Sequence, residues 1–140
     1  MKKTLINKII RGTDLRVLII GDNEESSKEL KVILKGFDII TDVAEKLNDI
    51  IKMYENNIYD IIFIEDREVK KDISEIINMI RDKEEGGNPL IIGILKDEDK
   101  EFRKILNENN IELILFKPVK EGQIVVILRN DFKEKILLNY

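Results

Sequence analysis

Acidic side chains and one lysine follow the apolar runs of this sequence in a regular way. Asp22 comes shortly after the first strong run, Glu65 and Asp66 directly follow the next, and Lys117 directly follows the last. Parallel strands bring their carboxyl ends to one edge of a sheet, so the three carboxylates are expected to form an acidic pocket facing the Lys117 ammonium. Oxygen ligands without thiolate or imidazole suit Mg²⁺, which makes Asp22 a candidate ligand for a weakly bound ion. Any one of these charges alone would be an ordinary residue at a strand end.

The composition excludes most other chemistry. Among 140 residues there is no His, no Cys and no Trp, and 24 basic against 28 acidic residues give a formal net charge of -4. A chain without His and Cys has no Ser-His-Asp triad, cysteine nucleophile, thiolate zinc site or disulfide. Any chemistry must therefore use carboxylates, lysine, hydroxyls and backbone groups. The length suits one domain.

Charge and hydropathy also limit the kinds of partner that this protein is expected to bind. A mildly acidic chain lacks the basic face expected of a nucleic-acid-binding protein. No apolar run approaches the roughly 20 residues that span a bilayer, and the N-terminus lacks the apolar core of a signal peptide. We therefore expect a soluble, cytoplasmic protein that binds neither nucleic acid nor membrane.

Five apolar runs alternate with five charged segments along the chain. The runs are rich in Ile, Leu, Val and Phe without strict alternation, which is typical of strands buried on both faces of a parallel sheet. Each charged segment carries one apolar stripe at helical spacing, and Asn109 is predicted to cap the fourth helix in the left-handed conformation. The predicted strands are residues 16–20, 37–43, 60–64, 90–95 and 112–116, and the predicted helices are residues 24–35, 45–56, 72–83, 97–107 and 121–138.

This alternation predicts an α/β fold. Strand and helix units with short connections favour right-handed crossovers and a parallel sheet covered on both faces. The expected architecture is a doubly wound, five-stranded parallel sheet with strand order 2-1-3-4-5, a flavodoxin-like three-layer sandwich of five βα units. A ligand site in such a sheet lies beyond the carboxyl ends of the strands, between the first and third.

Four segments carry a more specific pattern. They read RVLIIGDNE at residues 16–24, YDIIFIE at 59–65, PLII at 89–92 and FKP at 116–118. In this order and spacing they resemble the receiver domain of two-component response regulators, which is CheY-like in fold. The resemblance covers roughly residues 15–132.

The resemblance implies a phosphorylation site, from which this sequence departs at most positions. Such domains hold Mg²⁺ with an acidic pair after the first strand, accept a phosphoryl group on an Asp after the third, and contact the phosphate through a Thr or Ser after the fourth. A Lys after the fifth strand pairs with the phosphate and is usually followed by a cis proline. The matching positions hold Gly21 and Asp22 for the acidic pair, Glu65 for the phosphoacceptor, Ile94 and Leu95 for the hydroxyl, Ile114 for an aromatic switch residue, Glu68 and Val69 for a Met-Pro that often follows the acceptor, and Lys117 and Pro118 for the lysine and cis proline.

These departures predict a pseudo-receiver that does not cycle through phosphorylation and is not an enzyme. A glutamate extends its carboxylate by one methylene, about 1.5 Å, into the space that a phosphoryl group needs. A displacement of about 1 Å can slow a positioned reaction about 10²-fold. We expect no catalytic residue and no cofactor beyond weakly bound Mg²⁺. Glu65 is instead expected to form an ion pair with Lys117 that holds the domain in a single signalling state.

Two alternatives stay open. A one-residue bulge in the predicted strand at 60–64 would place Asp66 at the acceptor position and give a functional phospho-receiver. A flavodoxin-like fold can also bind small ligands in the same crevice, but the acidic turn at residues 21–27 lacks the repeated glycines that cradle a phosphate.

The two ends of the chain predict partner surfaces. Residues 15–140 are assigned to the receiver-like domain with an extended C-terminal helix, and residues 1–14 to an N-terminal extension or linker with a short helical stripe. The apolar surface at these ends predicts an interface, or the two terminal segments cover each other within one chain. The expected partners are a histidine kinase, an output domain or a second copy, and the expected homodimer uses the face formed by residues 97–107, 112–116 and the last helix.

Overall fold

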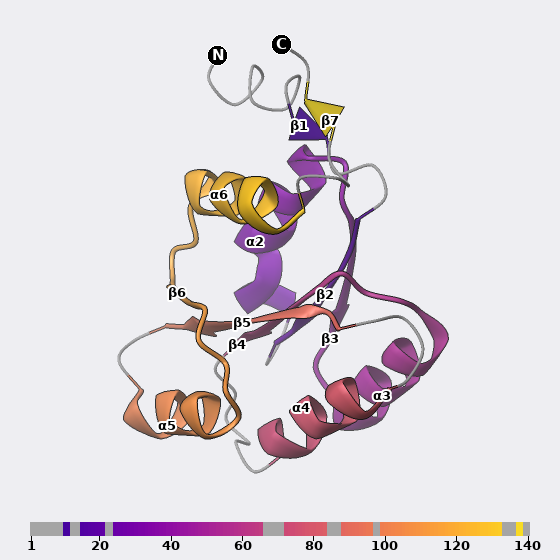
Figure 1. Ribbon diagram of the computed structural model, residues 1–140, viewed down its shortest axis with the longest axis vertical. Coiled ribbons are helices and arrows are strands. Elements are labelled where there is room, and N and C mark those ends of the chain that lie inside the picture. Colours follow the sequence, from indigo (N-terminus) through magenta and orange to yellow (C-terminus); the bar gives the residue numbers. More distant parts are fainter. Residues whose placement is uncertain are drawn as a thin grey trace.

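The computed structural model describes residues 10–11, 15–21, 24–65, 72–83, 88–96, 99–132 and 137–138. Its centre is a five-stranded parallel sheet with the spatial order β3-β2-β4-β5-β6 (Figure 1). Numbered along the chain without the short strand β1, this is the order 2-1-3-4-5, so the predicted fold class is confirmed. The strands are β2 (Arg16–Ile20), β3 (Ile40–Ala44), β4 (Ile61–Glu65), β5 (Leu90–Leu95) and β6 (Ile114–Phe116).

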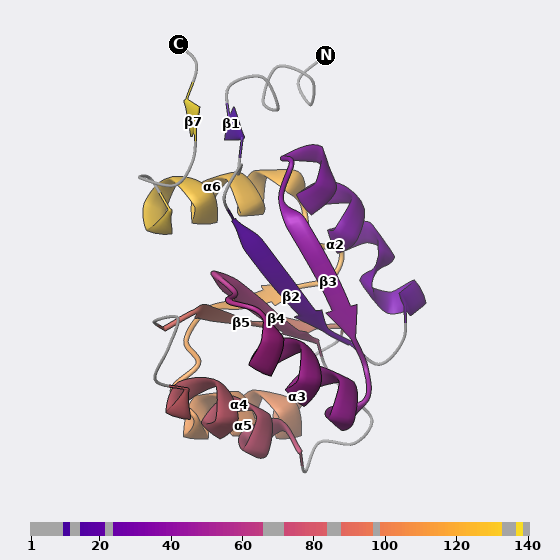
Figure 2. The ribbon, with the colours of Figure 1, turned by 90° about the vertical axis from the view of Figure 1, so that its right-hand side faces the viewer.

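Five helices cover the sheet in two layers. Helices α2 and α6 lie on one face, and helices α3, α4 and α5 lie on the other (Figures 1 and 2). No helix in the described part of the chain is long and apolar enough to cross a membrane. The helices are α2 (Glu24–Gly36), α3 (Leu47–Asn56), α4 (Ile73–Asp82), α5 (Lys100–Glu108) and α6 (Glu121–Asp131).

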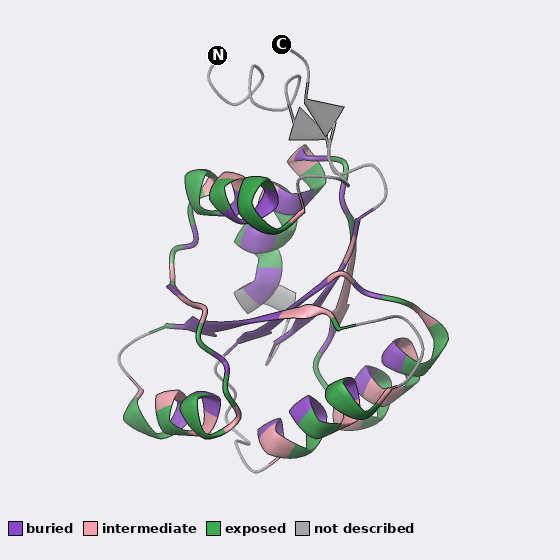
Figure 3. Ribbon diagram, in the orientation of Figure 1, coloured by how far each residue is buried: buried purple, intermediate pink, exposed green. Residues whose placement is uncertain are grey.

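Alternating residues of each strand build the two halves of the core. In β2, Val17 and Ile19 pack with α2 and α6, whereas Leu18 and Ile20 pack with the other three helices. Side chains of a strand point alternately to the two faces of a sheet, so a strand covered on both faces must be apolar throughout. This explains why β2 and β4 have no polar alternation, and why buried residues follow the sheet and the inner sides of the helices in Figure 3.

The C-terminal helix is shorter than the sequence predicts. It ends at Asp131 rather than at residue 138, and strand β7 (Leu137–Leu138) pairs antiparallel with β1 (Ile10–Arg11). Three successive apolar residues at 136–138 do not keep the spacing of a single helix stripe. Pairing with β1 gives the backbone of Leu137 and Leu138 partners. The predicted extended helix is therefore wrong, and the pairing favours the alternative in which the two ends of one chain meet. The rest of the predicted N-terminal stripe lies outside the described residues.

The left-handed residue after α5 is also one position later than predicted. Asn110 has φ 60°, whereas Asn109 has φ -100°. Helix α5 continues to Glu108, and the Asn109 side-chain amide donates to Ile105 O at 2.8 Å and to Ser74 Oγ at 3.1 Å. These bonds fix Asn109 at the end of the helix, so the turn falls on the following asparagine.

Candidate functional site

Glu65 is the last residue of β4, at the carboxyl edge of the sheet. The ladder between β4 and β5 is continuous from Ile61 opposite Leu90 to Glu65 opposite Ile94. No bulge interrupts this described stretch, so Glu65 itself occupies the end of the strand. Its side chain is only 2% exposed, which is exceptional for a carboxylate.

Lys117 meets Glu65 from the end of β6. The backbone N–H of Lys117 donates to Leu95 O at 2.8 Å, which extends the β5–β6 pairing by one residue. The Lys117 ammonium then lies 2.6 Å from Glu65 Oε2, within a charge-assisted hydrogen bond. The Lys117 side chain is 26% exposed, and the peptide bond between Lys117 and Pro118 is cis.

The described positions around this pair include Ile94, Ile114 and Gly21, which carry no polar side chain. Ile94, the neighbour of Glu65 across the ladder, is fully buried, and Ile114 packs on the opposite face of the sheet. Gly21 at the end of β2 is buried and donates its backbone N–H to Ala44 O at 3.1 Å. The second carboxylate oxygen, Glu65 Oε1, is buried without a hydrogen-bond partner among the described residues. The charge of Glu65 therefore depends on Lys117 for its compensation.

A Mg²⁺ ion does not fit the described residues of this site. Gly21 offers no side-chain oxygen, Ile94 offers no hydroxyl, and Glu65 Oε2 already accepts from the Lys117 ammonium. A divalent cation beside that ammonium would meet a like charge at short range. Within the described part of the chain, no group of three or more acidic residues is placed to hold a metal ion.

Two predicted members of the acidic pocket, Asp22 and Asp66, lie outside the described residues. The same holds for Glu68 and Val69, which follow the acceptor position. Of the predicted pocket, the structure therefore brings together Glu65 and Lys117.

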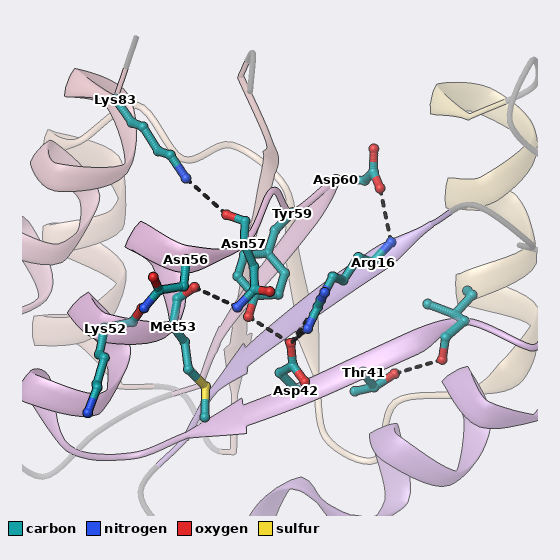
Figure 4. A network of polar contacts seen from close by, with 11 residues as sticks. Arg16, Thr41, Asp42, Lys52, Met53, Asn56, Asn57, Tyr59, Asp60 and Lys83 are labelled. Carbon is teal, nitrogen blue, oxygen red and sulfur yellow. Dashed lines mark hydrogen bonds and ion pairs between the residues drawn. The ribbon is translucent and has the colours of Figure 1, made fainter. Parts of the chain in front are cut away.

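A second polar cluster lies near the opposite, amino edge of the sheet, where β2, β3 and the residues before β4 meet (Figure 4). Arg16 donates from Nε and Nη2 to Asp42 Oδ2 at 3.0 and 2.9 Å, and the Tyr59 hydroxyl donates to the same oxygen at 2.7 Å. Burial of Tyr59, reinforced by its hydrogen bond to Asp42, raises the pKa of the phenol well above its ordinary value. The backbone N–H of Arg16 also donates to Asp60 Oδ2 at 3.0 Å.

This cluster joins elements far apart in sequence and has no reactive group. Lys83, just after α4, extends it by donating to the carbonyl oxygens of Tyr54 and Asn57 at 2.6 and 2.9 Å. Its ammonium also lies 4.5 Å from the centre of the Tyr54 ring, a cation–π contact. We assign the cluster a structural role. Sequence reasoning missed it, although Asp42 inside an apolar run was a signal.

Comparisons with known proteins identify the fold. No protein-family model and no curated protein matches this sequence. A signal receiver domain of a two-component histidine kinase from Clostridium thermocellum gives a TM-score of 0.68 at 18% identity, over 83% of this chain and 95% of that one. An orphan response regulator of H. pylori gives 0.64 at 21% identity, over 85% and 96%. A receiver domain of a Saccharomyces cerevisiae response regulator, crystallised with a histidine phosphotransfer protein, gives 0.63 at 18%, over 84% and 86%.

The sheet order, the layers and the pair at the carboxyl edge place the chain in the doubly wound α/β class, with its candidate site where that class has one. Within this class, the solved structures with the same fold include many CheY-like receiver domains. The chain has the CheY-like fold of response regulator receiver domains.

Proposed function

We propose that this protein is a non-enzymatic signalling module, a receiver-type domain that binds protein partners without being phosphorylated. The observation that carries the proposal is the ion pair between buried Glu65 and Lys117, 2.6 Å apart. At the acceptor position an aspartate would leave space for a phosphoryl group, whereas the longer glutamate fills that space and reaches the lysine directly.

The ion pair supports the proposal of a single signalling state. A receiver switches when a phosphoryl group draws a hydroxyl and a lysine toward itself. In this chain the lysine is already paired, and Ile94 has no group to be drawn. A ligand shifts a two-state equilibrium only when it binds the two states with different affinities. Without these contacts, phosphate would bind both states about equally and would not shift the conformation.

Protein partners follow from the fold as a proposal. Among proteins of this fold, one is a receiver domain of a histidine kinase and another was crystallised with a histidine phosphotransfer protein. We therefore propose a histidine kinase, an output domain or a second copy as the partner, in the cytoplasm, and no nucleic acid.

The proposal predicts that acetyl phosphate with Mg²⁺ leaves the mass of the intact protein unchanged. A phosphorylatable receiver domain treated in parallel controls for active reagent, and mass spectrometry is the measurement. A stoichiometric gain of one phosphoryl group would contradict the proposal. Glu65→Gln and Asp66→Asn variants would then show which carboxylate accepts it, because the gain disappears only in the variant that lacks the acceptor.

The proposed homodimer predicts that Phe116→Glu weakens self-association at least about tenfold, because apolar anchors dominate protein interfaces. Phe116 on β6 is 44% exposed and Val126 on α6 is 56% exposed, on the elements of the proposed dimer face. Val32→Glu is the matched control, since Val32 is 53% exposed on α2, outside this face. Sedimentation velocity measures both. A wild type that stays monomeric at all concentrations, or equal effects of the two variants, would contradict this interface.

A further inference from the structure

A cleft of about 680 Å³ opens at the amino edge of the sheet, at the other end of the strands from Glu65 and Lys117. It lies between the start of β5, the segment that leads into β6, and the ends of α4 and α6. Its volume is within the range of small-molecule sites, roughly 300–1,000 Å³. Its lining includes Arg81, Leu90, Ile91, Glu112, Leu113 and Asp131.

The cleft exists because β5 begins several residues before its pairing with β6 begins. Strand β5 pairs with β4 from Leu90 onward, but its pairing with β6 begins only at Gly93, whose N–H donates to Leu113 O at 3.0 Å. The turn at Asn110, with φ 60°, brings the chain in from α5 before it joins β5. The space between the start of β5 and residues 110–113 is therefore left open.

The lining of this cleft combines apolar side chains with polar and charged ones. Ile91 is buried, while Leu90 and Leu113 are half-buried and line the cleft. Such a surface accommodates an apolar body and removes it from water. The carboxylates of Glu112 and Asp131 are on exposed residues at the rim.

The electrostatics of the rim favour a cation. Among the described lining residues, the two carboxylates of Glu112 and Asp131 outnumber the one guanidinium, that of Arg81, which donates to Asn109 O. Helices α4 and α6 both end here, since Arg81 lies in the last turn of α4 and Asp131 is the last residue of α6. The carbonyl end of a helix carries a partial negative charge, which adds to that of the carboxylates.

We propose that this cleft binds a small organic cation with an apolar body, such as an aryl-alkyl ammonium. The ammonium lies between Glu112 and Asp131, and the apolar body lies on Leu90, Ile91 and Leu113. This site is separate from the proposed function, because it uses neither Glu65 nor Lys117 and lies at the other edge of the sheet.

The test is an NMR titration of the ¹⁵N-labelled 140-residue chain with three compounds of similar size: phenethylammonium, 2-phenylethanol and phenylacetate. We expect saturable shifts of the amides of Leu90, Ile91 and Leu113 with the cation, and at least about fivefold weaker binding of the neutral and anionic compounds. Equal affinity for all three compounds, no saturable shift, or shifts centred on Glu65 and Lys117 would overturn the proposal.

Charge-reversed variants locate the cation. Glu112→Lys and Asp131→Lys are each expected to weaken phenethylammonium binding about threefold to tenfold, because an exposed attraction becomes a repulsion. Both residues are exposed, so the fold should persist, and Glu55→Lys on α3 is the matched control. Unchanged affinity in both rim variants, or an equal loss in the Glu55→Lys control, would overturn the assignment.

Discussion

Replacing Lys117 with methionine is expected to lower the free energy of unfolding by about 3–5 kcal/mol, because it leaves the buried Glu65 carboxylate without its counter-charge. Glu65 is 2% exposed and its Oε1 has no partner among the described residues, so Lys117 is its described counter-charge. Methionine keeps the length and apolar stem of lysine, which limits the loss of packing. Urea unfolding followed by circular dichroism measures the change.

Two further variants separate the ion pair from packing. In Glu65→Gln the remaining charge is that of Lys117, which is 26% exposed and can turn toward water, so a smaller loss of about 1–2 kcal/mol is expected. The double variant Glu65→Leu with Lys117→Met removes both charges and should recover most of the stability, since an apolar pair often replaces a buried ion pair without loss. If Lys117→Met changed stability by less than about 1 kcal/mol, the pair would be a solvated surface contact.

The contact between Glu65 and Lys117 was predictable because it depends on topology alone. Each residue directly follows an apolar run, and parallel strands place their carboxyl ends at one edge. The structure brings the two charges to 2.6 Å. The bulge that would have favoured Asp66 is absent from the described β4 ladder, whose register runs unbroken to Glu65.

The errors arise where two distant segments compete with a local pattern. The spacing of Val125, Leu128 and Phe132 fits a helix, and the helix does include the first two. The helix ends at Asp131, and β7 beyond it pairs with β1, which lies more than a hundred residues earlier in the chain. No local pattern in the sequence encodes that register. Likewise, the amino-edge cleft depends on how many residues of β5 precede its pairing with β6. Strand boundaries predicted from sequence are not precise enough to show this.

The cluster around Asp42 was not predicted, although an aspartate inside an apolar run was a signal, because its members come from three separate segments. Asp42 lies opposite Leu18 in the β2–β3 ladder, and the two residues that donate to it are Arg16 and Tyr59. An isolated aspartate in an edge strand reads as a surface residue. The pairing of β2 with β3 on one side and with β4 on the other brings an arginine and a buried tyrosine to the same oxygen.

Asp42→Ala is therefore expected to lower the free energy of unfolding by about 2–3 kcal/mol. Most of this comes from the Tyr59 hydroxyl, which is left buried without its acceptor, a loss of about 1–3 kcal/mol. The contact with Arg16 adds less than about 1 kcal/mol, because both side chains are partly exposed. Asp42→Asn keeps an acceptor at this position and should lose only about 1 kcal/mol. Equal effects of alanine and asparagine would show that the carboxylate oxygen is not the acceptor that matters.

The same contact makes the protein sensitive to alkali. Burial and the hydrogen bond to Asp42 raise the pKa of Tyr59 above its ordinary value of 10.0, so the folded form keeps the phenolic proton after the unfolded chain has lost it. The unfolded state then binds fewer protons, and stability falls as the pH rises above about 10, by up to about 1.4 kcal/mol per pH unit. Tyr59→Phe removes this contribution to the pH dependence. Burial also raises the pKa of Tyr54, and the contribution of Tyr54 is the same in wild type and variant. The difference between wild type and Tyr59→Phe should therefore be constant below pH 9 and narrow above pH 10. A difference that stays constant through this range would show that Tyr59 ionises equally in both states.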